Sequence, residues 1–336
     1  MNAPAAIEEC QAVDAPTSLA GFADRTAPLV VRGLCRDWPL VRHALASDTE
    51  FARHLAAHDS GAAVDALLLA PDADGCIGYN AAFDGFNFSH HRIDIRGGLQ
   101  RLAQYSRQPD APGLAIQSAL IAECLPGLLA EHTLPGMPET VQPRIWIGNR
   151  VTTPAHFDEY HNLACVVCGR RRFTLFPPEQ VRNLYIGPLD LAPTGAAISV
   201  ARLDRPDDPR YPRLREALAA GQVAELGPGD AIYIPPMWWH HVASLERLNA
   251  LVNYWWQPQP VHGDRAHTAL GCLLHCILAL RSLPPAEREA WRGLLDHYVF
   301  AADEPLAHIP AARRGVLSAL DAEQVEALRE RIRSYL

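Results

Sequence analysis

The sequence predicts a mainly β fold of the double-stranded β-helix, or jelly-roll, type, with α/β elements before it and helices after it. Residues 143–258 are almost all short apolar segments separated by turn signals, which is typical of jelly-roll strands. Residues 15–140 mix helical and strand patterns, and the pattern from 259 to 336 is helical. We therefore expect a disordered N-terminus over 1–14, a jelly-roll domain with its N-terminal α/β elements over 15–258, and a C-terminal helical region over 259–336.

The N-terminal elements begin with Pro28–Pro39, where a short apolar strand is followed by a turn. A helix is expected over Leu40–Ala46, and a further helical pattern covers Gln117–Glu131 with an interruption at Pro126. The first residues of the chain carry no basic segment and no apolar segment of the kind found in signal peptides. We therefore expect a poorly ordered start and a cytoplasmic protein.

The central region contains the candidate strands of the jelly roll. In order they are RIWIGNRV, AHFDEYHNLACVVC, RRFTLFPP, AAISVARL, QVAEL, DAIYIPP, HHVASL and NALVNYWW. Gly227–Asp230 predicts a tight turn, and Ala231–Pro236 predicts a short buried strand that ends at a proline break. A histidine delivered after that break would lie at the rim of a barrel, where small-molecule sites are commonly built.

The C-terminal region predicts three helices. The apolar run Ala269–Leu280 is too short to span a bilayer and indicates a buried helix. A second helix can start with proline and cover Pro285–Phe300, and Asp321 with Gln324 can cap a third. The apolar residues of this last helix share one stripe: Val325, Leu328, Ile332 and Leu336. Either the chain's own barrel or a second copy in a homodimer must cover that stripe.

The net charge and the cysteine spacing argue against a nucleic-acid-binding protein and against a disulfide framework. The net charge of −8 disfavours nucleic acid as a partner, because nucleic-acid-binding surfaces are usually basic. The eight cysteines are scattered rather than arranged as a disulfide framework, which suits a reducing compartment. We therefore expect neither nucleic acid nor a membrane as a partner.

His156, Asp158 and His240 are the most informative residues for function. On a strand, residues i and i+2 project to the same face, so His156 and Asp158 can converge on one point. Two histidines and one carboxylate occupy one face of an octahedron and leave three positions open, as in non-haem Fe(II) oxygenases. An isolated HxD pair arises easily by chance among fifteen histidines, and these residues alone do not separate His240 from His241.

Several motifs together resemble the cupin-like JmjC branch of Fe(II)/2-oxoglutarate oxygenases. They are Thr153–Gln180, Gly227–Val242 and Leu251–Trp256, and Pro28–Pro39 is similar to the N-terminal signature of that branch. In motif the chain is similar to the family's asparaginyl hydroxylase, which acts on hypoxia-inducible factor. The resemblance implies hydroxylation of a C–H bond in a peptide, protein side chain or small metabolite, with Fe(II), 2-oxoglutarate and O₂ consumed or bound and succinate and CO₂ released.

Carried over by position, the resemblance makes His156, Asp158 and His240 the iron ligands. It selects His240 over His241 because the family's ligand directly follows two tryptophans. Five further positions match residues in or near the co-substrate pocket: Thr153, Asn162, Arg171, Asn253 and Trp255.

Two residues depart from the family pattern. Arg171 stands where the relative has a lysine, but it keeps the charge and can bind a carboxylate through two parallel hydrogen bonds. Ala115 stands where the relative has a tyrosine, so one donor to the co-substrate is lost, which is worth about 1.5–3 kcal/mol. Two alternatives therefore stay open: a metal-binding cupin with other chemistry, or a binding or regulatory protein without turnover.

Overall fold

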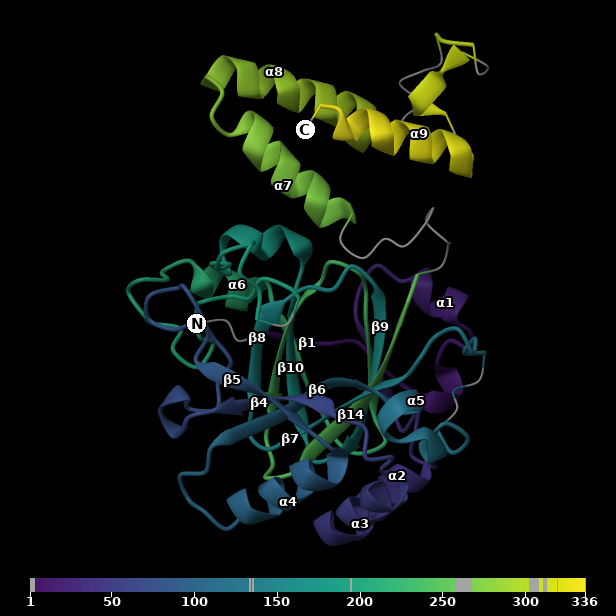
Figure 1. Ribbon diagram of the computed structural model, residues 1–336, viewed down its shortest axis with the longest axis vertical. Coiled ribbons are helices and arrows are strands. Elements are labelled where there is room, and N and C mark those ends of the chain that lie inside the picture. The colour runs from purple at the N-terminus through teal and green to yellow at the C-terminus, as the bar shows by residue number, and fades with distance from the viewer. Residues whose placement is uncertain are drawn as a thin grey trace. The chain divides into compact units, whose positions relative to one another are not determined.

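Two β-sheets form the core of the first part of the chain in the computed structural model (Figure 1). The structure describes residues 4–132, 134, 136–193, 195–257, 268–301, 308–310, 313–318 and 320–335. Residues 1–3 of the expected disordered N-terminus lie outside this description. So do residues 259–267, 302–307, 311, 312 and 319 of the expected C-terminal region, and Leu336 of its apolar stripe. By its contacts the chain divides into two units, Met1–Pro258 and Gln259–Leu336.

The strand order confirms the predicted mainly β jelly-roll fold. The five-stranded sheet has the order β1 (Ala5–Ala6), β11 (Gln222–Leu226), β10 (Arg171–Phe176), β13 (Trp239–Ser244), β8 (Thr152–His156). The nine-stranded sheet has the order β2 (Glu9–Gln11), β3 (Leu29–Arg32), β12 (Ala231–Ile234), β9 (His161–Cys168), β14 (Asn249–Trp256), β7 (Arg144–Gly148), β6 (Gly113–Leu120), β4 (Val64–Leu69), β5 (Phe88–Ile93).

Alternating side chains of both sheets meet in one apolar core. Its buried members come from either sheet: Ile7, Val30, Ala164, Val166, Phe173, Leu175, Ala224, Leu226, Ile232, Ile234, Trp238 and Leu251. Successive strand residues face opposite sides, so every second residue of β9 and β10 enters this core. Full burial of each large apolar side chain contributes about 1.5–3 kcal/mol. The inward positions near the starts of β9 and β10, Asn162 and Arg171, are polar instead, and they belong to the site described below.

Helices cover the other face of the nine-stranded sheet. They are α2 (Pro39–Ala46), α3 (Asp48–His58) and α4 (Ile95–Tyr105), which lie together below the strands in Figure 1. Their buried residues pack against the outward residues of β7 and β9: Leu40, Val41, Phe51, Leu55, Ile95, Leu99, Leu102, Ile145, Ile147, Cys165 and Val167. Short helices connect the remaining strands: α1 (Leu19–Ala23), α5 (Ile121–Cys124) and α6 (Leu214–Ala220).

The second unit is helical, as its sequence pattern predicts, but the helix over Ala269–Leu280 is not buried within it, and Leu278 is 77% exposed. It contains α7 (Thr268–Leu280), α8 (Pro285–Leu295) with a π-helical turn over Asp296–Phe300, and α9 (Ala322–Arg333). A proline occupies the first turn of α8, and α9 begins with the capping box of Asp321 and Gln324. Among the described residues, none of the helices is both long enough and apolar enough to cross a membrane.

Three segments differ from the sequence expectation. Ala5–Ala6 and Glu9–Gln11 are not disordered, because they add parallel edge strands to β11 and β3. Gln117–Leu120 is not helical: it continues β6 beside β7, with a bulge where Ser118 takes a φ of 46°. The segment 196–203 forms no strand beyond an isolated bridge between Ser199 and Ile186.

Candidate functional site

His156 and His240 lie directly opposite each other on the paired strands β8 and β13, with ring centroids 4.2 Å apart. Each imidazole donates a hydrogen bond from Nδ1 to the backbone carbonyl two residues earlier, Pro154 at 2.9 Å and Trp238 at 3.1 Å. Because a carbonyl can only accept, these bonds fix the proton on Nδ1 and leave each Nε2 free as a ligand.

Asp158 completes the cluster from a turn. β8 ends at His156, so the expectation that both residues lie on one strand is wrong, although their side chains do converge. The backbone N–H of Met237 donates to the carbonyl of Asp158 at 2.8 Å and holds the turn beside β13. Candidate ligand atoms of His156, Asp158 and His240 all lie within 4.8 Å of one another. Two imidazoles and a carboxylate at this spacing could hold one metal ion.

A chain of polar side chains orients the Asp158 carboxylate. Its Oδ2 accepts hydrogen bonds from Trp255 Nε1 at 3.1 Å and from Asn162 Nδ2 at 3.4 Å. Asn162 Oδ1 in turn accepts from Asn253 Nδ2 at 3.3 Å, and Asn253 Oδ1 accepts from Trp146 Nε1 at 2.9 Å. Sequence reasoning missed Trp146. The alternation of RIWIG, with apolar neighbours facing the helices, could have indicated that it faces inward.

Arg171 places a buried cation at the start of β10. The preceding turn depends on Gly169, whose φ is 67° and where a Cβ would lie 2.4 Å from the carbonyl oxygen of Leu248. Arg171 is only 8% exposed, its Nη2 reaches the carbonyl of Trp146 at 3.5 Å, and its Nε is buried without a hydrogen-bond partner. Burial lowers the pKa of Arg171 to about 10, so it stays charged at neutral pH.

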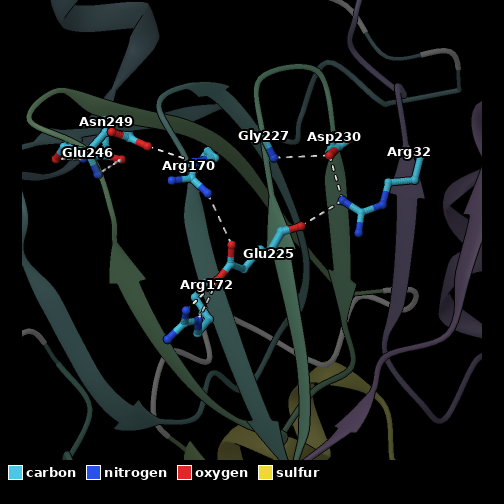
Figure 2. A network of polar contacts seen from close by, with 8 residues as sticks. All are labelled: Arg32, Arg170, Arg172, Glu225, Gly227, Asp230, Glu246 and Asn249. Carbon is cyan, nitrogen blue, oxygen red and sulfur yellow. Dashed lines mark hydrogen bonds and ion pairs between the residues drawn. The ribbon is translucent and has the colours of Figure 1, made fainter. Parts of the chain in front are cut away.

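The neighbours of Arg171 point the other way. Arg170 Nε pairs with Glu246 at 2.8 Å, and Arg172 Nη2 pairs with Glu225 at 2.6 Å, on the outer face of the sheet (Figure 2). Of the three consecutive arginines, Arg171 is therefore the one available to an anion inside the barrel, since the other two already have carboxylate partners.

Thr153 and Ala115 differ in what they offer to the expected pocket: Thr153 has a hydroxyl group and Ala115 has no polar side-chain atom. Thr153 pairs with Val242, which packs against the core between the sheets, so Thr153 also faces inward. Ala115 is buried in an apolar cluster with Leu67 and Val151 and contributes no polar side-chain atom. The structure therefore also has no side-chain hydrogen-bond donor at position 115, as the sequence indicates.

The geometry brings His240 into the cluster and turns its neighbour away. His241 follows on the opposite face of β13, opposite Thr174, and its Nδ1 is buried without a partner. Burial lowers the pKa of His240, assisted by the nearby His156, and lowers the pKa of His241 to about 4. Both rings are therefore neutral at pH 7, the form in which a histidine binds a metal.

The tryptophans divide between structure and site. Trp238 donates to the carbonyl of Thr26 at 3.1 Å and Trp239 to that of Pro178 at 3.2 Å, and both are buried in apolar clusters. Trp255 instead faces the cluster through its bond to Asp158. Two of the three are thus mainly core residues.

The sequence comparisons place this site in a known family. The family model for a cupin-like domain matches residues 16–262. The chain belongs to this family. Among curated relatives of this cupin-like protein, Jumonji C domain-containing protein 5 of Drosophila melanogaster is 32% identical over 194 residues, 54% of this chain and 46% of that protein. Lysine-specific demethylase JMJ31 of Arabidopsis thaliana is 39% identical over 113 residues, 33% of this chain and 20% of that protein.

The name of a third relative mentions neither a Jumonji C domain nor an activity. HSPB1-associated protein 1 of Homo sapiens is 33% identical over 149 residues, 44% of this chain and 30% of that protein. The cupin-like chain therefore spans less than half the length of each of these relatives. The family predicted from the motifs, cupin-like with JmjC relatives, is confirmed.

Proposed function

We propose that this cupin-like protein is an Fe(II)- and 2-oxoglutarate-dependent oxygenase that hydroxylates a C–H bond. The observation that carries the proposal is the cluster of His156, Asp158 and His240, together with the buried Arg171, which has no carboxylate partner among the described residues. This ligand set suits non-haem Fe(II) and leaves positions open for a co-substrate and O₂. Membership of the cupin-like family, with JmjC relatives, supports the same class of enzyme.

The chain's own residues prepare the metal ligands. The backbone bonds at Nδ1 aim both imidazoles through Nε2, and the bonds from Trp255 and Asn162 fix Oδ2 of Asp158 while leaving Oδ1 available. Fe(II) bound there supplies O₂ activation coupled to conversion of 2-oxoglutarate to succinate and CO₂, with one oxygen atom delivered to the substrate.

Arg171 is our candidate for the residue that binds the distal carboxylate of 2-oxoglutarate, with Thr153 on the same inward face. A buried guanidinium without a carboxylate partner is costly, and an incoming carboxylate would supply that partner. The planar fork can form two parallel hydrogen bonds, which can compensate for the donor absent at Ala115.

The substrate class we propose is a peptide, a protein side chain or a small metabolite. One relative is named a lysine-specific demethylase. Hydroxylation of an N-methyl carbon gives a carbinolamine that releases formaldehyde, so hydroxylases and demethylases of this kind share the same C–H step. We propose that shared step for this chain.

The direct test is anaerobic titration of the Fe(II)-loaded protein with 2-oxoglutarate. Chelation of the oxo acid to iron produces a weak visible charge-transfer band, and we expect a saturable band in the wild-type protein. The matched control is Asp158→Ala, which removes one of three ligands and should abolish both iron retention and the band while circular dichroism stays unchanged.

Three outcomes would contradict the proposal or its ligand assignment. Iron bound without any band would favour a cupin with other metal chemistry, because the co-substrate pocket would then be absent. Failure to bind either iron or 2-oxoglutarate would favour a binding or regulatory protein. Tight stoichiometric iron in Asp158→Ala would show that the ligand assignment itself is wrong.

A further inference from the structure

A second cluster of possible metal ligands lies in the helical layer on the outer face of the nine-stranded sheet. His54 and His58 are one turn apart on α3, and Glu131 follows the 3₁₀ turn η3 (Pro126–Leu128). Their candidate ligand atoms all lie within 4.8 Å of one another. His54 Nε2 is 3.4 Å from Glu131 Oε2, and His58 Nε2 is 4.0 Å from Glu131 Oε1.

Two atoms at the centre of this cluster are buried and unsatisfied. His54 Nε2 and Glu131 Oε2 face each other, yet neither has a hydrogen-bond partner. Buried polar atoms in native proteins nearly always have partners, and each one left without costs about 1–3 kcal/mol. A cation bound between the two atoms would satisfy both at once.

A simple ion pair explains the cluster less well, because His54 Nε2 and Glu131 Oε2 lie 3.4 Å apart and yet form no hydrogen bond. A neutral imidazole offers a lone pair at Nε2, which is what a metal ion requires.

Neighbouring residues hold the two imidazoles in place. His43 of α2 stacks on His54, with ring centroids 4.3 Å apart and an interplanar angle of 21°. The ring of His58 lies against Gly127, where a Cβ would be 2.3 Å from its Nδ1. Any side chain at position 127 would therefore displace His58 from Glu131.

The segment that carries Glu131 is anchored by the next residue. His132 is buried; its Nδ1 donates to the carbonyl of Leu128 at 2.8 Å, and its Nε2 accepts from the N–H of Leu40 at 3.3 Å. The side chain of Tyr254 also anchors this segment, because its hydroxyl donates to the carbonyl of His132 at 2.9 Å. The carboxylate is thus presented by a fixed backbone rather than by a free loop.

We propose that His54, His58 and Glu131 bind a zinc ion that joins α3 to the segment after η3. Histidines at i and i+4 of a helix project from one face and, with a carboxylate, form a common zinc donor set. In helical zinc proteases a glutamate follows the first histidine as general base, but here that position is the buried Leu55. The site therefore lacks this base, and with three protein ligands a tetrahedral zinc ion would keep one position for water.

Zinc binding can be measured with the other cluster disabled. We use the untagged full-length chain carrying His156→Ala and Asp158→Ala, and we titrate it with Zn²⁺ by calorimetry. The expected result is one tightly bound equivalent, which is lost when either His58→Ala or Glu131→Gln is added. Both side chains are partly exposed, so these variants should fold, and circular dichroism checks that they do.

A thermal melt gives an independent readout. Zn²⁺ should raise the Tm of the double variant, and this shift should vanish with Glu131→Gln but persist with the matched control His90→Gln, an exposed histidine outside both clusters. One equivalent that survives both His58→Ala and Glu131→Gln would overturn the proposal. So would a double variant that binds no Zn²⁺ while the wild-type chain binds one equivalent.

Discussion

Arg171 shows how a single residue can favour binding at the expense of stability. Its guanidinium is buried, and among the described residues no carboxylate pairs with it. Burying a charge without a partner is costly, whereas a charged hydrogen bond to a ligand is strong. The free protein and the ligand-bound protein should therefore respond in opposite directions when this charge is removed.

We expect Arg171→Leu to weaken 2-oxoglutarate binding and to stabilise the free protein. Loss of charged hydrogen bonds worth about 1.5–3 kcal/mol corresponds to about 10- to 100-fold weaker binding. The titration that follows the charge-transfer band measures the affinity, and a urea denaturation midpoint measures the stability. Arg171→Lys keeps the charge without the fork and should retain part of the affinity.

The adjacent arginine is the matched control for this prediction. Arg170 pairs with Glu225 and Glu246 on the outer face, so Arg170→Leu should leave 2-oxoglutarate binding unchanged. Equal loss of affinity in the Arg170 and Arg171 variants would mean that net charge, rather than a specific contact, attracts the co-substrate.

Residue types and spacing predicted the candidate metal ligands but not their surroundings. His156, Asp158 and His240 are visible because an HxD pair and a histidine after a proline break are local signals. Glu131 carries no such signal, and the alternation around Trp146 indicates only that it faces inward, because the role of each residue depends on which strand or helix lies beside it. The zinc proposal needed the fold to bring α3 and the segment after η3 together.

Among the elements, the short, mainly apolar strands bounded by turn residues were predicted best. NALVNYWW coincides with β14, since it is buried on both faces between β7 and β9. Gln117–Leu120 has the apolar spacing of a helix, but pairing with β7 satisfies its backbone and the bulge at Ser118 absorbs the irregular spacing. Tertiary pairing overrode local pattern there.

His161 makes the start of β9 sensitive to acid. Its Nδ1 lies 2.8 Å from the hydroxyl of Tyr233, and its ring stacks on Trp256 at 5.4 Å. Burial lowers its pKa below the usual 6.5, so the unfolded chain takes up this proton more readily than the folded chain. Stability linked to His161 is thus present above pH 6.5 and is lost as the pH falls through that value towards the folded pKa.

We therefore expect His161→Gln to reduce the acid sensitivity of the fold. Glutamine keeps hydrogen-bonding capacity towards Tyr233 but does not titrate. As the pH is lowered from about 7.5 to about 5.5, the wild type should lose more stability than the variant. Urea denaturation at each pH measures the free energy of unfolding of both proteins. His308→Gln, at an exposed position, is the control. A pH-independent difference for His161→Gln would contradict the linkage.

At the scale of the whole molecule, the helical unit presents apolar side chains that need a partner. Leu278 is 77% exposed, Phe300 is 72% exposed and Val299 is 62% exposed. Clusters of exposed large apolar residues on soluble proteins commonly mark interaction sites. We propose that a second copy of the chain covers these residues, because closed two-fold dimers are the commonest assemblies and use the same surface on both subunits.

The oligomeric state tests this directly. Light scattering on the full-length chain should give twice the 36.9 kDa chain mass. The double change Leu278→Glu, Phe300→Glu should give the monomer, because a two-fold dimer would bury both new charges of each of its two subunits. Arg281→Glu, also on the helical unit but not apolar, should stay dimeric. If α7 and the π-helical turn after α8 join two copies, dilution should dissociate the dimer without unfolding the strands that carry the metal ligands. Iron retention should then not depend on protein concentration. A wild-type monomer, or a glutamate variant that remains dimeric, would contradict the proposal.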